Sequence, residues 1–168
     1  THNVAAQPTT LGKRFANTAE ELINAYNKAN FLYNHFPLRG LKGAVGTQQD
    51  LLDLFEGNFE KVDLIEKRLA EILEFDEILD SVGQVYPRSL DFEVIAALVQ
   101  ISSAPENFSK TIRLMAGHNL LSEGFQEGQV GSSAMPHKTN TRTSERISGL
   151  SVILKGYLSM FGGLVGDQ

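Results

Sequence analysis

The sequence contains no cysteine and no long apolar run. Without cysteine, disulfide scaffolds, thiol chemistry and cysteine-ligated zinc sites are excluded. No apolar stretch approaches the roughly 20 residues that a membrane-spanning helix needs, and the N-terminus lacks the basic lead and apolar run of a signal peptide. We therefore expect a cytoplasmic protein that has no role in a membrane.

Positive charge is also scarce. Fifteen Lys and Arg stand against twenty Asp and Glu, which leaves a formal charge of −5, so the basic footprint of a nucleic-acid binder is missing. The apolar fraction of 42% and the length of 168 residues fit one packed domain. The chain starts at Thr1 and still has a helical pattern from Tyr157 to Gln168. We therefore expect a fragment of a longer protein.

Two long amphipathic helices are predicted, one near each end of the chain. In each, apolar side chains recur every three or four residues and so form one stripe. The first stripe contains Phe15, Ala19, Leu22, Tyr26, Ala29 and Tyr33, and the second contains Ile147, Leu150, Leu154, Tyr157, Phe161 and Leu164. Gly149 and Gly156 lie seven residues apart, a spacing that allows another backbone to approach closely.

The middle of the chain adds three shorter helices. Apolar positions from Val62 to Ile72 form one face, the run from Phe92 to Ile101 is apolar on every side, and a new stripe begins at Phe108 after the break expected at Pro105. No second strand exists to pair with the apolar run, so we favour a helix there. The result is an all-α chain of five helices, with more apolar surface than a monomer can bury, and we expect self-association.

Two glycine-rich loops interrupt this helical pattern, at residues 34–47 and 122–142. A connection of about 20 residues without regular structure is uncommon in a compact bundle, and such loops are usually binding loops or lids. We therefore expect residues 122–142 to form a long, flexible functional loop.

The stretch GSSAMPHKTNTRTSER, residues 131–146, concentrates site chemistry at the end of this loop. It runs into a helix, whose first turn presents free N–H groups and a partial positive charge. With Lys138, Asn140 and Arg146, that turn would form a cradle for carboxylates or phosphates. The alternative is a solvated loop that only caps the helix, and physical reasoning alone leaves the two interpretations about equal.

The pattern G-S-S-x-M-P-x-K-x-N in this stretch resembles the signature loop of the fumarase and aspartase superfamily. GSSAMPHK followed by SER is most similar to the adenylosuccinate lyases, and three other segments match as well, THNVAAQPTTLGKR at 1–14, RGLKGAVGTQQ at 39–49 and GQVYPRSLD at 83–91. Thr141 stands where the family usually has proline, and we expect Thr141 to cap the helix instead.

The resemblance implies a fold and an assembly. Residues 1–168 correspond to the central long-helix bundle domain of the family, without its N-terminal and C-terminal domains. In the family, one active site combines segments from different subunits of a homotetramer. We therefore expect a homo-oligomer with shared sites, and a fragment that is inactive alone.

The resemblance also assigns the acid and the base. It implies that Ser132 removes the Cβ proton of the succinyl group and that His2 protonates the departing nitrogen. A serine hydroxyl is a poor base in water, so we expect Lys138 and backbone N–H groups to favour the alkoxide. Imidazole titrates near neutrality, which suits His2 as the acid. Without the motif, Ser132 and Ser133 would be ordinary polar loop residues, and His2 a frayed terminal residue.

The remaining candidates are implied to hold the substrate. Lys138 and Asn140 would bind carboxylates, Arg146 the succinyl or phosphate end, and Gln84 the substrate through its amide, with the rest of the set being Thr1, Thr47, Gln48 and Ser133. Gly40, Gly43 and Gly46 match neither nucleotide-binding fingerprint, so we interpret them as turn glycines. His35, His118 and His137 lack the spacing of metal ligands, and we expect no metal and no cofactor.

The implied activity is elimination of fumarate by a C–N lyase of purine biosynthesis. Its substrates would be adenylosuccinate, which yields AMP, and the succinylated imidazole carboxamide ribotide. Two alternatives remain open: another lyase of the superfamily, such as an argininosuccinate lyase or a cycloisomerase, and a non-catalytic assembly scaffold. The segments TTLGKR and SER argue against another lyase.

Overall fold

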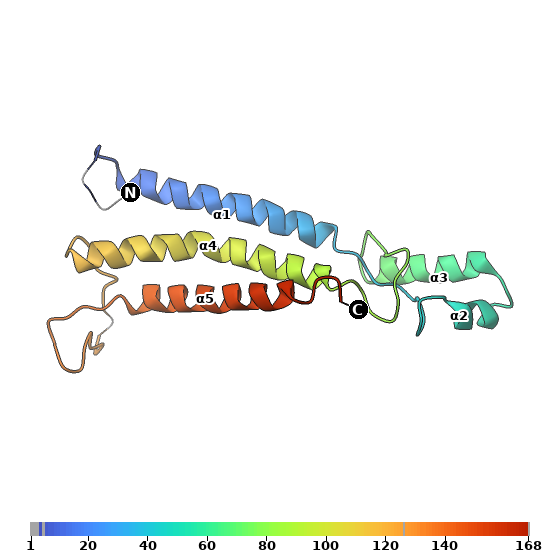
Figure 1. Cartoon of the computed structure of the whole chain (residues 1–168). Helices are drawn as coiled ribbons and strands as arrows, with labels where there is room; N and C mark the ends of the chain where they lie inside the picture. The colour runs from blue at the N-terminus through green and yellow to red at the C-terminus, as the bar shows by residue number, and fades with distance from the viewer. Residues whose placement is uncertain (1–3, 5, 126, 168) are drawn as a thin grey trace. The chain divides into compact units, whose positions relative to one another are not determined.

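The computed structural model describes residue 4, residues 6–125 and residues 127–167. This part of the chain folds into five helices, α1 (Leu11–Asn34), α2 (Gln49–Leu54), α3 (Phe59–Ile72), α4 (Ser89–Gly117) and α5 (Arg142–Gly162) (Figure 1). Across these described residues there is no strand, and only one isolated β-bridge joins Leu38 to Ile78. The predicted all-α fold is confirmed.

The break expected at Pro105 is wrong, because α4 runs through it without interruption. Proline removes one backbone donor and costs roughly 3 kcal/mol inside a helix. Ala104 is completely buried beside it, so packing around this turn offsets that cost. The hydroxyls of Ser102 and Ser103 donate to the carbonyls of Val99 and Gln100, at 2.9 and 2.7 Å. The helices expected at 92–101 and from 108 are therefore one helix.

Two other boundaries differ from the prediction. The helix α2 was missed, because six residues are too few to show a 3.6-residue period. The last helix, α5, ends at Gly162, so Leu164 lies beyond it in a turn.

The chain divides into two compact units. The first unit comprises Thr1–Tyr26 and Leu98–Gly156, and the second comprises Asn27–Ala97 and Tyr157–Gln168.

In the first unit, parts of α1, α4 and α5 lie side by side (Figure 1). The rings of Phe15 and Phe108 join α1 to α4 with centroids 5.2 Å apart, and the Ser103 hydroxyl donates to Glu21 at 2.8 Å. An ion pair between Lys155 and the buried Glu106 joins α5 to α4.

The second unit contains a buried ion pair. Lys42, on the loop after α1, donates to Glu66 of α3 at 2.7 Å, and both side chains are almost fully enclosed. The same carboxylate accepts the backbone N–H of Leu41 at 2.8 Å. This loop is therefore fixed against α3.

Large apolar side chains remain uncovered on all the long helices. Among the described residues the buried apolar side chains are small, namely Ala25, Val62, Ala70 and Ala104. Much larger ones are more than half exposed, among them Phe31, Tyr33, Phe59, Leu150, Val152 and Met160. Within the described ranges, no helix combines the length and the apolar character that a membrane crossing requires.

Candidate active site

The signature loop, residues 131–140, closes on itself between α4 and α5. The Asn140 side-chain amide donates to the Gly131 carbonyl at 3.0 Å, so the two ends of the loop are joined. Inside the loop, the N–H of Lys138 donates to the Met135 carbonyl at 2.9 Å. These bonds accompany a turn-rich conformation of residues 131–140, and the expected flexibility of the loop stays a prediction.

Gly131 is required where this loop closes. A Cβ atom at residue 131 would overlap the Lys138 carbonyl oxygen and lie 3.2 Å from the Phe125 ring. The backbone of Lys138 can therefore approach this closely only because residue 131 has no side chain.

Ser132, the candidate base, is half-buried in the loop, and its Oγ accepts the backbone N–H of Met135 at 3.2 Å. A donor aimed at this oxygen stabilises negative charge on it. Such a donor is one of the two kinds of group expected to favour the alkoxide. Lys138, the other expected group, is exposed, and its role toward Ser132 stays a prediction.

A pocket of about 460 Å³ lies where α4, the signature loop and α5 meet within the first unit. Lys138 and Asn140 line it, as expected for residues that bind substrate. Arg113 of α4 and Glu145 of α5 also line it, and sequence reasoning missed both. No local signal marks Arg113, since only the fold brings the end of α4 to the loop, whereas Glu145 lies within the SER segment that follows the signature loop. The other lining residues are Ala116, Gly117, Asn119, His137, Thr139 and Thr141.

The backbone N–H groups of Thr143 and Ser144 at the start of α5 are already paired within the chain, which favours the capping interpretation of this helix N-terminus over the anion cradle. Glu123 accepts the backbone N–H groups of Thr143 and Ser144, at 3.1 and 2.9 Å, and the Ser144 hydroxyl at 2.5 Å. Glu123 therefore provides the side-chain cap that was expected from Thr141. Arg146, one turn further along α5, is exposed.

These contacts hold the Glu123 carboxyl in its charged form. Partial burial by itself raises the pKa of Glu123, but the hydrogen bonds from Ser144 and Thr143 outweigh it and keep the pKa below the ordinary glutamate value. An internal carboxylate thus satisfies the donors that we had expected to bind a ligand.

The candidates Thr47 and Gln84 lie on two loops of the second unit, and these loops touch. A Cβ atom on Gly46 would overlap the Val82 carbonyl, and Gly46 has a positive φ of 81°, as the interpretation as a turn glycine predicted. Arg39 links the loops further, because its guanidinium donates to the carbonyls of Gly43 and Gly83 at 2.9 and 2.7 Å. Both Thr47 and Gln84 are exposed.

Gln48, the third candidate in this unit, uses its side chain within the chain. Its amide donates to the Leu41 carbonyl at 3.2 Å and to Glu66 at 3.4 Å. Gln48 also adopts a left-handed backbone conformation, with φ of 56°, just before α2. This side chain fixes the loop next to Thr47.

The segment after Gln84 is anchored at the start of α4. The Tyr86 hydroxyl donates to Asp91 at 2.8 Å, and Arg88 forms an ion pair with the same carboxylate at 3.3 Å. The hydrogen bond to Asp91, with burial, raises the pKa of Tyr86 above its ordinary value. The segment GQVYPR therefore presents Gln84 from a rigid support.

Thr1 and His2, the candidate acid, lie outside the described residues. Within the described ranges, no three His, Asp or Glu side chains gather as metal ligands would.

Comparisons with known proteins identify the same family as the resemblance of the signature loop. A family model described as lyase matches residues 1–156. The adenylosuccinate lyase of Saccharomyces cerevisiae is 38% identical over 151 residues, which cover 90% of this chain and 31% of the relative. That of Schistosoma mansoni is 38% identical over 152 residues (90% and 32%), and that of Archaeoglobus fulgidus is 33% identical over 161 residues (94% and 34%).

The chain spans about a third of the length of these curated relatives. The matched region contains every candidate site residue, from Thr1 to Arg146. The chain therefore belongs to this lyase family, as its resemblance to the fumarase and aspartase superfamily predicted.

Proposed function

We propose that this chain works in an adenylosuccinate lyase, a C–N lyase that eliminates fumarate from adenylosuccinate to give AMP. The same elimination would act on the succinylated imidazole carboxamide ribotide. The observation that carries the proposal is the closed GSSAMPHK loop, with Ser132 half-buried under a backbone donor. Relatives named adenylosuccinate lyase support this substrate over that of another superfamily lyase.

In the proposed reaction, Ser132 removes a proton from Cβ of the succinyl group. The resulting carbanion is stabilised as the aci-form of the neighbouring carboxylate, and the Cα–N bond then breaks. His2 gives a proton to the departing nitrogen. The Met135 N–H bond to Ser132 supports the base, since it favours the charged oxygen.

Two groups of side chains would hold the substrate. Lys138, Ser133 and Arg146 supply donors and positive charge for the carboxylates, and Asn140 has a second amide hydrogen besides the one used on Gly131. Gln84, Thr47 and Thr1 would contact the rest of the nucleotide, with Gln48 fixing the loop beside Thr47. We propose that the working enzyme is a cytoplasmic homotetramer with shared sites.

Fumarate release, followed by absorbance on the complete gene product, tests this function. We expect turnover of adenylosuccinate, no turnover of argininosuccinate, and a loss of kcat of roughly 10²–10⁴-fold in Ser132→Ala. Ser159→Ala, at an exposed serine of α5, is the matched control and should keep wild-type kcat. A wild-type protein that binds but does not cleave adenylosuccinate would instead indicate the non-catalytic scaffold.

A further inference from the structure

Three donors converge on the Glu123 carboxylate, and they use both of its oxygens. One oxygen accepts the N–H of Thr143, and the other accepts the N–H and the hydroxyl of Ser144. Hydrogen bonds to an ionised acceptor are about twice as strong as neutral ones. The exposed Glu123 side chain is therefore held by three charge-assisted hydrogen bonds to the start of α5.

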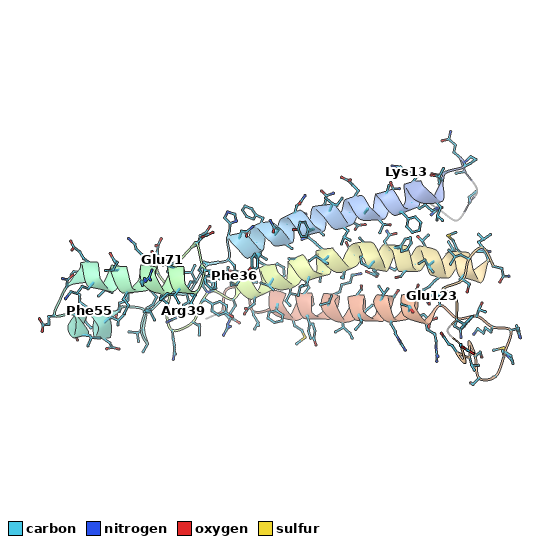
Figure 2. The ribbon with its side chains drawn as sticks, turned by 180° about the vertical axis from the view of Figure 1, so that it is seen from behind. Lys13, Phe36, Arg39, Phe55, Glu71 and Glu123 are labelled. Carbon is cyan, nitrogen blue, oxygen red and sulfur yellow. The ribbon has the colours of Figure 1, made fainter. Side chains whose placement is uncertain are left out.

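The contact between Glu123 and Ser144 joins the two ends of the functional loop, residues 122–142. Glu123 and Ser144 are 21 residues apart, and the loop that carries Ser132 lies between them in the sequence. Figure 2 shows Glu123 beside the end of α5 that follows this loop. Ser144 is only 2% exposed, and Thr141, just before α5, only 8%, so Glu123 is attached to α5 at a point that is itself buried. A loop fixed to such a point takes its position from α5.

A second contact joins two residues that both lie between Glu123 and Ser144 in the sequence. The Asn140 amide joins the signature loop to Gly131, but this bond connects two loop residues and by itself sets only the shape of the loop. The Glu123 contact connects the loop to a helix. The inner bond thus shapes the loop, and the outer contact places it.

We propose that Glu123 is a positioning residue of the active site, whose contact with the first turn of α5 sets where Ser132 stands relative to the substrate. This inference rests on the proposed function. It goes beyond helix capping, since a cap contributes stability alone, whereas a positioning contact changes turnover. A misplacement of about 1 Å can lower a rate about 100-fold.

The first test compares three variants of the complete gene product. Glu123→Gln keeps the size of the side chain but turns an amide donor toward donor groups, so we expect kcat to fall about 10- to 100-fold with KM changed less than about threefold. Glu123→Asp keeps the charge and should retain an intermediate kcat. Glu127→Gln makes the same change at an exposed glutamate of the same loop and should keep wild-type kcat. Wild-type kcat in folded Glu123→Gln would overturn the proposal, as would equal losses in Glu123→Gln and Glu127→Gln.

The second test restores the missing carboxylate from solution. Glu123→Ala leaves the donors of Thr143 and Ser144 free, so added acetate should raise its kcat in a saturable way and leave Glu127→Ala unchanged. If Glu123→Ala does not fold, Glu123→Asp replaces it as the test. An intermediate kcat then supports the positioning role, and a kcat as low as that of Glu123→Gln contradicts it. Failure of acetate to raise kcat in folded Glu123→Ala would count against positioning.

Hydrogen exchange separates this proposal from the proposed function. Amide exchange at Thr143, Ser144 and residues 131–138 should be faster in Glu123→Gln than in wild type, whatever reaction the enzyme performs. If wild type does not cleave adenylosuccinate but this exchange still accelerates, only the proposed function fails. If exchange in these segments is unchanged while wild type is active, the positioning role of Glu123 fails.

Discussion

Arg39 joins two loops whose exposed residues are candidates for substrate binding. Its guanidinium bonds to the Gly43 carbonyl and, 44 residues away, to the Gly83 carbonyl. Gln84, one of these candidates, is the residue after Gly83 in the sequence. A planar guanidinium can serve both carbonyls at once, whereas a lysine ammonium on a flexible stem holds such geometry poorly.

We therefore expect Arg39→Lys to raise KM for adenylosuccinate about tenfold, with little change in kcat. The physical reason is that Gln84 loses its support while the Ser132 loop, which belongs to the other unit, is untouched. Steady-state kinetics on the complete gene product measures this. The control is Arg68→Lys, at an exposed arginine of α3 that pairs with Glu71 on the same helix, and an equal rise in KM there would contradict the prediction.

Sequence reasoning found the residues that form a motif and missed those that support it. Ser132, Lys138 and Asn140 lie close together in the chain, so their pattern predicted the loop. Glu123 and Arg39 act on partners 21 and 44 residues away, and a single sequence contains no signal for such pairs. For this reason the sequence could not decide between an anion cradle and a capped helix N-terminus at the start of α5, where Glu123 provides the cap.

Among the helices, the amphipathic stripes predicted α1 and α5 correctly. The prediction for α4 was wrong at Pro105, where tertiary packing outweighs the local preference of the sequence. The stripes headed by Phe15 and Ile147 correspond to α1 and α5. Proline carries a strong local preference to end a helix, but the buried surface around Ala104 overrides it. Burial depends on the tertiary fold, so the local sequence of α4 could not reveal it.

The ion-pair cluster between α4 and α5 makes stability depend on pH. Hydrogen bonds from Lys110 and Lys155 to the buried Glu106 outweigh the effect of burial and lower the pKa of Glu106 below 4.5. The unfolded chain therefore binds this proton more readily than the folded one. The stabilisation is complete above about pH 4.5 and is lost as the pH falls through the lowered pKa.

We expect Glu106→Gln to be less stable than wild type near pH 7 and to lose less stability than wild type on acidification below about pH 4.5. Urea unfolding at a series of pH values gives both free energies. Glu93→Gln, at an exposed glutamate of the same helix, should follow the wild-type curve. Parallel curves for Glu106→Gln and wild type would show that the cluster does not contribute.

For the whole molecule, uncovered apolar surface supports the proposed self-association. Leu150, on the stripe headed by Ile147, is 62% exposed, and a soluble monomer rarely leaves large contiguous apolar areas in contact with water. Gly149, next to it, has nothing within 4 Å of a Cβ position, so a second backbone has room to approach.

We expect the complete gene product to sediment as an oligomer at micromolar concentration and Leu150→Glu to shift it toward smaller species. Placing a charge in an apolar interface costs several kcal/mol unless the charge is paired. Asn107→Glu adds the same charge at an exposed polar site of α4 and should not change the sedimentation coefficient. A stable wild-type monomer would contradict the proposed assembly.

Shared active sites predict that two inactive variants restore each other. If Ser132 and His2 of one site come from different subunits, a mixed oligomer of Ser132→Ala and His2→Ala contains some sites with both native residues. In a tetramer assembled at random from equal amounts of the two variants, a minority of the active sites contain both native residues. We therefore expect each variant alone to lose roughly 10²–10⁴-fold in kcat and the mixture to recover a substantial fraction of wild-type turnover.

The decisive measurement is fumarate release after the two variants are unfolded together and refolded, with native mass spectrometry to show that hybrids formed. A mixture of Ser132→Ala with Lys138→Ala is the control, because both substitutions lie in one loop and would always leave every site without at least one of the two residues. Recovery only in the first mixture places Ser132 and His2 on different chains. No recovery in a mixture shown to contain hybrids would mean that both residues act from one chain, or that His2 is not the acid.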